Sequence, residues 1–122
     1  MNSRRHTPVL LALTLAMLAP ATAMAGEPIT DCVDLGNDQE ILRDSGQQFS
    51  LRNGGDHYRV HFQRRCDSIL IASRVDILSQ DKTSRLCATD TRVKTGRETC
   101  HVASVETMTA EEFARQKRRA SR

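Results

Sequence analysis

The clearest pattern of apolar and polar positions lies in the middle of the chain, between residues 48 and 63. From His57 to Gln63 the two classes alternate without a break, which places Tyr58, Val60 and Phe62 on one face of an extended strand. Residues 48–52 alternate in the same way, and Asn53-Gly54-Gly55-Asp56 separates the two runs. Asn and Gly accept the positive φ that tight hairpin turns require. The pattern therefore predicts a β-hairpin.

Shorter strand-like segments lie on both sides of this hairpin. Frequent polar and Gly-containing turns between short apolar or alternating runs are typical of small antiparallel β folds. We therefore expect a mainly β fold, a small antiparallel sandwich or barrel of about six or seven short strands. The segment 68–72 fits either a buried strand or one helical turn. The other expected strands are residues 40–43, 74–78, 85–88, 91–94 and 100–105.

The alternation of apolar and polar residues ends near the C-terminus. Thr109 and Glu112 have the spacing of a capping box, and residues 110–119 have helix-forming composition. Acidic residues at the start and basic residues at the end suit the helix dipole. The sequence predicts a short C-terminal α-helix. Because Phe113 is its one large apolar side chain, we expect this helix to be loosely docked.

The N-terminal segment has the order of a secretory signal peptide. Arg4 and Arg5 precede ten apolar residues at positions 9–18, and the small-residue stretch ATAMAG follows. Ten residues are too few to span a hydrocarbon core of ~30 Å. We expect cleavage between Ala25 and Gly26, with a site after Ala23 as the alternative. The expected organisation is a cleaved leader at 1–25, a small β domain at 26–108 and a helix with a basic tail at 109–122. We expect the mature protein to be exported to the periplasm or secreted. No transmembrane segment is expected in the mature chain.

Four cysteines follow the leader. An even number in a short exported chain predicts two disulfides, which would staple the small fold. A turn at Thr95-Gly96-Arg97 would place Cys100 opposite Val93 or Lys94, and therefore away from Cys87. Three pairings are open to four cysteines. Among them we favour Cys32–Cys100, which would join the entry segment to the last strand, and Cys66–Cys87, which would close the middle of the chain.

Charge is distributed unevenly along the mature chain. Residues 26–114 hold 11 Lys and Arg against 15 Asp and Glu, whereas residues 115–122 hold five basic residues and no acid. Basic and acidic residues are mixed throughout the body, which excludes an extended nucleic-acid surface. We favour a frayed, solvated helix end for the basic tail, and a contact with anionic lipid or an acidic partner is the alternative. The basic residues of the tail are Arg115, Lys117, Arg118, Arg119 and Arg122.

Patterns typical of catalysis are lacking. On a strand His57 and His61 would lie roughly 13 Å apart, too far to share one zinc ion. The cysteine spacings contain no C-x-x-C, and no G-x-S-x-G turn occurs. Asp90 fits a turn after Cys87, where its carboxylate would accept backbone hydrogen bonds. We therefore predict no catalytic residue, no metal ligand and no cofactor.

The order of these features resembles that of small exported bacterial domains grouped as a family of unknown function. The resemblance covers about residues 31–115. It implies an exported, small, mostly β protein without an assigned reaction. This chain has Asp67-Ser68 where the family pattern has proline and glycine. The segments that carry the resemblance are DCVDL at 31–35, FSLRNGGDHY at 49–58, RC at 65–66 followed by IL at 69–70, LCATD at 86–90, Cys100 and TAEE at 109–112.

These observations favour a non-catalytic exported domain that binds a protein or a surface of the cell envelope. A small ligand-binding or metal-binding module is the first alternative, and an enzyme of unassigned reaction is the second. The basic tail is a possible contact, but the sequence names no partner.

Overall fold

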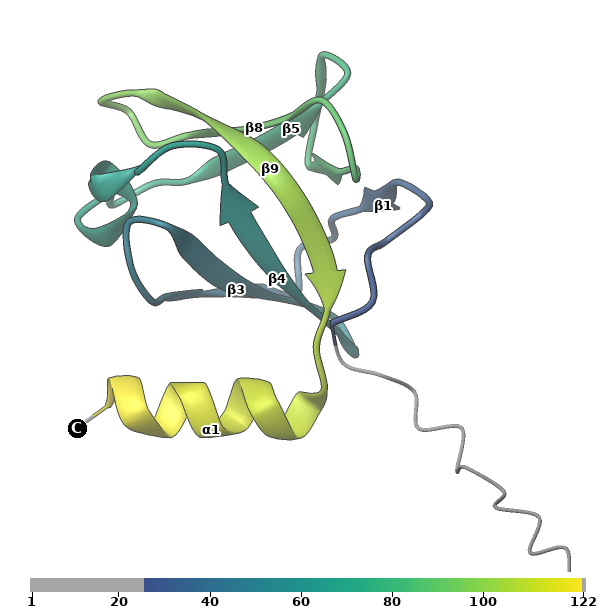
Figure 1. Cartoon of the computed structure of the whole chain (residues 1–122), viewed down its shortest axis with the longest axis vertical. Coiled ribbons are helices and arrows are strands. Elements are labelled where there is room, and N and C mark those ends of the chain that lie inside the picture. Colours follow the sequence, from purple (N-terminus) through teal and green to yellow (C-terminus); the bar gives the residue numbers. More distant parts are fainter. Residues whose placement is uncertain (1–25, 122) are drawn as a thin grey trace, which may run out of the picture.

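The computed structural model describes residues 26–121, in which nine β-strands, one 3-10 helix and one α-helix are arranged as in Figure 1. The expected mainly β class with a C-terminal helix is confirmed. The leader expected at residues 1–25 lies outside the described residues. The elements are β1 (Val33–Asp34), β2 (Gln39–Arg43), β3 (Gln48–Asn53), β4 (Asp56–Phe62), η1 (Asp67–Leu70), β5 (Asp76–Ser79), β6 (Lys82–Thr83), β7 (Arg85–Leu86), β8 (Thr91–Lys94), β9 (Thr99–Thr107) and α1 (Ala110–Ala120).

The predicted hairpin is formed by β3 and β4. Asn53 pairs with Asp56, which leaves Gly54 and Gly55 as a two-residue turn. Gly54 has a φ of 60°, in the left-handed region that glycine enters without steric cost. Tyr58, Val60 and Phe62 are buried, and the residues between them are partly exposed. The alternation therefore identified the inward face correctly.

Seven strands form one curled antiparallel sheet in the order β2-β3-β4-β9-β8-β5-β6. The long strand β9 joins its two halves: residues 102–107 pair with β4, and residues 99–101 pair with β8. His61 lies opposite Ser104 and Phe62 opposite Val102, so Ala103 is an extra residue in β9. Such a bulge bends a strand and increases its twist. The curl encloses a core whose fully buried members include Phe49, Leu51, Val60, Ile69, Leu86 and Val93.

The outer edge of β2 lies against the segment that follows η1. Arg43 Nε donates to Ile69 O at 2.8 Å, and Arg43 Nη2 donates to Ala72 O. At the other end of β2, Gln39 and the segment 75–77 line a narrow gap of about 80 Å³. Arg43 therefore ties the end of β2 to η1 and to the segment that follows it.

Two disulfides are present as expected, but the favoured pairing is wrong. Cys32 bonds to Cys87, with Cα atoms 4.2 Å apart, and Cys66 bonds to Cys100, with Cα atoms 5.9 Å apart. The first bridge follows from the small sheet β1–β7. Val33 lies opposite Leu86 there, so the cysteines adjoining them in the sequence meet. This pairing joins segments far apart in the chain, and no local pattern reports it.

The second disulfide forms where the chain leaves β4. Gln63 N donates to His101 O at 2.9 Å, which brings this segment alongside the start of β9 and places Cys66 next to Cys100. Cys100 lies opposite Val93, so it is not the partner of Cys87, as predicted. The bridged cysteines are 55 and 34 residues apart. Loops of this size make each bridge worth about 4 kcal/mol, mainly by restricting the unfolded chain.

The C-terminal helix packs on the outer face of the hairpin, so the expected loose docking is wrong (Figure 1). Its start is as predicted, because Thr109 Oγ1 accepts from Glu112 N at 3.1 Å. Phe113 is only 4% exposed and packs with Leu42 and Met108. Its apolar partners come from β2 and from the link after β9, neither of which the helix sequence itself reveals.

Replacing Phe113 with alanine tests this docking. Alanine favours helix formation more than phenylalanine does, so any loss of stability comes from the missing contact with the sheet. We expect the free energy of unfolding in a denaturant titration to fall by about 3 kcal/mol. Trypsin should also cleave within α1 faster than in the parent protein. Phe113→Leu, which keeps an apolar contact, should show a smaller change in both. Parent-like values for Phe113→Ala would contradict the docking.

Candidate functional site

The basic residues of the tail are divided between two faces of α1. Lys117 contacts the sheet, with its Nζ 2.8 Å from Glu40 Oε1. Arg115, Arg118 and Arg119 are exposed, and within residues 26–121 no carboxylate lies within salt-bridge distance of them. At about 100° per residue, these three project from the side of the helix opposite Phe113. We call them the α1 arginine face. Arg122 lies outside the described residues.

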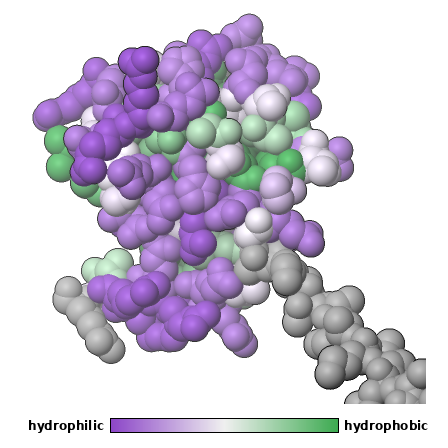
Figure 2. Space-filling model, viewed as in Figure 1, coloured by the Kyte–Doolittle hydropathy of each residue, from purple (hydrophilic) through white to green (hydrophobic). Residues whose placement is uncertain are grey.

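Fewer than half of the eleven basic residues at positions 26–114 have a carboxylate partner. Five arginines of the body each lie within 4.0 Å of a carboxylate oxygen. The part of the surface formed by α1, at the bottom of Figure 2, is predominantly hydrophilic. The α1 arginine face therefore places three basic residues without carboxylate partners on one side of one helix. The five paired arginines are Arg52, Arg59, Arg65, Arg74 and Arg92.

A hollow of about 550 Å³, the α1 hollow, lies between the end of α1 and strands β2–β4. Most of its charges already have partners. Gln48 Nε2 donates to Asp44 Oδ2 at 2.7 Å, and Arg59 lies 3.7 Å from a Glu106 oxygen. Of the basic residues that line it, Arg119 is the one that also belongs to the α1 arginine face. The α1 hollow therefore adds little free charge. It is lined by Arg43, Asp44, Gln48, Arg59, Gln116, Arg119 and Ala120.

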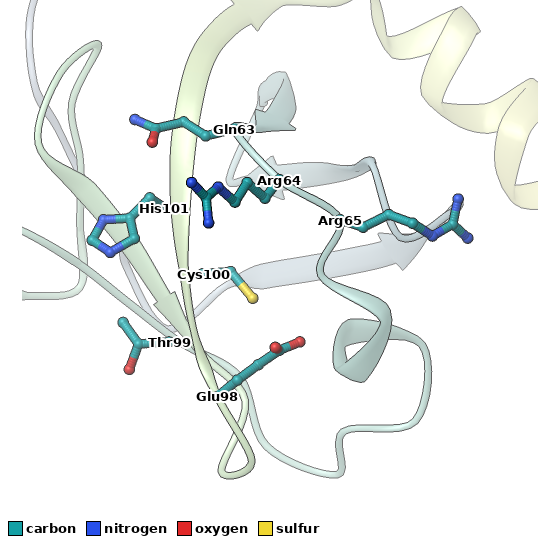
Figure 3. A pocket seen from close by; sticks show the side chains of 7 residues that line it. All are labelled: Gln63, Arg64, Arg65, Glu98, Thr99, Cys100 and His101. Atoms are coloured by element: carbon teal, nitrogen blue, oxygen red, sulfur yellow. The ribbon is translucent and has the colours of Figure 1, made fainter.

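A second hollow, the polar hollow, has a volume of about 430 Å³ and lies where the chain leaves β4 and enters β9 (Figure 3). The sequence did not identify this site, because its two halves are distant in the chain. The one local signal is the run of two arginines that follows the alternating strand. The lining residues are Gln63, Arg64, Arg65, Glu98, Thr99, Cys100 and His101.

Two charged residues of the polar hollow are engaged elsewhere. Arg65 Nε donates to Asp67 Oδ1 at 2.8 Å, and in Figure 3 Arg65 points away from the other side chains. Glu98 Oε1 accepts from Ser68 Oγ at 2.6 Å. Arg64, in contrast, lies across β9 with its guanidinium toward His101 in Figure 3. Within residues 26–121, no carboxylate lies within salt-bridge distance of Arg64.

One cluster has the composition of a metal site. The ligand atoms of Cys66, Glu98 and Cys100 all lie within 4.8 Å of one another. Both sulfur atoms are joined in the disulfide, however, and zinc requires thiolates as sulfur ligands. In the oxidised protein this cluster is therefore a structural crosslink with a carboxylate beside it.

The histidines of β4 have separate partners. The rings of His57 and Phe113 lie 5.0 Å apart, and His61 Nε2 lies 2.9 Å from Glu106 Oε1. Both histidines occupy the outer face of β4, as predicted, but α1 covers part of that face. His57 therefore contributes to the docking of α1, and His61 contributes to an ion-pair network. The two histidines do not form one site.

A buried hydroxyl network holds the chain around Cys87. Thr91 Oγ1 accepts from Cys87 N at 3.0 Å, and Ser79 Oγ lies 2.6 Å from Thr91 Oγ1. Asp90 has a φ of 57° and marks the expected turn. The acceptor role predicted for Asp90 belongs to Thr91. This network therefore satisfies backbone groups next to the Cys32–Cys87 disulfide.

No family model, curated protein or solved structure matches this chain. The resemblance to exported domains of unknown function therefore stays a prediction. Among the helices of residues 26–121, none is long and apolar enough to cross a membrane.

The contact between Lys117 and Glu40 gives a prediction about pH. The hydrogen bond from Lys117 lowers the pKa of Glu40 below its ordinary value; the charges of Lys117 and Arg52 add to this effect, and partial burial opposes it. Since the pKa is lowered in the folded state, the contact stabilises the protein above the ordinary carboxyl pKa. That contribution is lost as the pH falls through the folded pKa. We expect Lys117→Met to raise the pKa of Glu40 in an NMR titration.

Arg118→Met is the matched control for this measurement. It removes one positive charge from the same helix without touching Glu40, so the pKa of Glu40 should stay at its parent value. An unchanged pKa in Lys117→Met would show that the contact does not persist in solution.

Proposed function

We propose that this chain is a non-catalytic exported domain that binds an anionic surface of the cell envelope through the α1 arginine face. One observation carries the proposal: three arginines without carboxylate partners project from one side of a helix whose other side is packed on the sheet. The leader predicted from the sequence supports export, and the two disulfides are compatible with it.

The docking of α1 determines the kind of binding. An amphipathic helix that enters a membrane uses its apolar face for insertion. Here Phe113 is already buried against Leu42 and Met108, so α1 has no free apolar face to insert. Binding is therefore electrostatic. At about 1 kcal/mol for each basic residue near an anionic leaflet, three arginines supply roughly 3 kcal/mol.

Charge asymmetry orients the domain on such a surface. The body carries more acidic than basic residues, whereas the described part of the tail is basic. An anionic surface attracts α1 and repels much of the body. The domain is thus held by one side, and the sheet stays exposed to other molecules. Weak attraction through few charges also makes the binding reversible and sensitive to salt.

The metal-binding alternative has less support. The cysteines beside Glu98 form a disulfide, and His57 and His61 contact different partners. The ligand-binding alternative is supported by a separate observation. Arg64 and His101 line the polar hollow without a carboxylate partner within residues 26–121, and this hollow lies on another face of the domain.

Sedimentation with lipid vesicles tests the proposal. The protein should bind vesicles that contain phosphatidylglycerol at low salt, bind much less at high salt, and not bind vesicles of phosphatidylcholine alone. We expect the triple variant Arg115→Gln, Arg118→Gln and Arg119→Gln to bind roughly 100-fold more weakly, since it removes about 3 kcal/mol of attraction.

The control variant, Arg74→Gln, Lys82→Gln and Arg97→Gln, removes the same charge from exposed positions away from α1. It should bind nearly as well as the parent protein. Equal losses in the two triple variants would mean that net charge alone governs binding. No binding to anionic vesicles at low salt would overturn the proposal and leave an acidic protein as the partner to seek.

A further inference from the structure

We propose that the polar hollow is a second binding site, which takes the phosphate group of a small molecule. It lies at the opposite end of the domain from α1 in Figure 1 and does not depend on the function proposed for that helix. The starting observation is that Arg64 and His101 both line this hollow and that, within residues 26–121, no carboxylate lies within salt-bridge distance of either; Glu98 is the one carboxylate in the lining.

The register of β9 adds donors to this pair. Thr99 and His101 are two residues apart, so both lie on the outer face of β9, whereas Cys100 points inward to its disulfide. Their cross-strand neighbours on β8 are Lys94 and Arg92, respectively. Side chains that are directly opposite in an antiparallel pair lie on the same face, with Cβ atoms about 5 Å apart. The start of β9 is therefore surrounded by basic residues from two other segments.

Two of the acidic residues nearby pair with other arginines, and the third, Glu98, keeps its charge. Asp81 lies 3.2 Å from Arg92, and Asp76, opposite Lys94, lies 3.4 Å from Arg74 instead. Glu98 lies on the other side of Cys100 from Arg64 in Figure 3, where Ser68 binds its carboxylate. Arg64 and His101 are left as the basic residues of the lining without a carboxylate partner, with the Thr99 hydroxyl beside them; Lys94 lies on the neighbouring strand, outside the lining.

The two walls of the hollow are fixed before any ligand arrives. The Cys66–Cys100 disulfide and the bond from Gln63 N to His101 O hold the end of β4 against β9. Ser68 Oγ lies 2.7 Å from Thr95 Oγ1, which ties η1 to the turn before β9. A site held in this way loses little conformational freedom on binding.

The donors suit a phosphate group. A guanidinium donates two parallel hydrogen bonds to an oxyanion, and a hydroxyl and an imidazole add donors from other directions. A tetrahedral phosphate accepts from several directions, whereas a carboxylate accepts only in its plane. The volume of about 430 Å³ is in the range of small-molecule sites, and the polar lining does not favour an apolar ligand.

The test is an NMR titration of the oxidised protein with inorganic phosphate and with glycerol phosphate, at constant pH and ionic strength. We expect saturable shifts at the amides of Arg64, Thr99 and His101. Arg64→Gln should weaken binding by about tenfold, because a bidentate charged contact is lost. Arg97→Gln removes an exposed arginine from the neighbouring turn, and should change affinity by less than about twofold.

Three results would overturn the proposal. They are the absence of saturable shifts, equal losses in the two variants, and equally tight binding of acetate, which would show that the hollow does not select phosphate. Shifts that include the α1 arginine face with the same affinity would count against it too, since they would report general attraction of anions. Both variants should keep the parent pattern of amide signals and two intact disulfides, so a loss in Arg64→Gln alone reports the site.

Discussion

The pairing of β9 with two different strands is the interaction on which the rest of the structure depends. Its second half pairs with β4 and its first half with β8, so one strand joins the hairpin side of the sheet to the side formed by β5, β6 and β8. The bulge at Ala103 lies at the point of change. Without β9 each half would expose an apolar face, and neither could bury it alone.

Both candidate surfaces are attached to the two ends of this strand. Its first residues, Thr99 to His101, carry the disulfide to Cys66 and one wall of the polar hollow. Its last residue leads through Met108 into α1, and Met108 N donates to His57 O at 3.0 Å. The two candidate surfaces are thus placed by the strands of the fold core itself.

Net charge alone is a poor guide to this protein. The body is acidic overall, but many of its carboxylates are paired with neighbouring arginines, such as Asp38 with Arg52 and Glu106 with Arg59. Arg64 and the three residues of the α1 arginine face have no such partner within residues 26–121. Exposed ion pairs contribute little to stability. Arginines without a carboxylate partner are the ones whose charge is available to an anionic ligand.

Local features were predictable from the sequence, and long-range neighbours were not. The hairpin turn at Gly54 and the helix start at Thr109 are encoded within a few residues, where backbone preferences and side-chain capping act directly. The partners of Cys32 and Phe113 depend on strand order, which no local pattern contains. For the same reason Arg64 and His101, 37 positions apart in the chain, were not recognised as neighbours.

Native-state hydrogen exchange, followed by NMR on the oxidised protein, tests the central role of β9 most directly. If β9 joins the two halves of the sheet, its paired amides between Cys100 and Val105 should exchange only through global unfolding, with the highest protection in the domain. Exchange of these amides through a low-energy local opening, while β3 and β4 stay protected, would contradict this account.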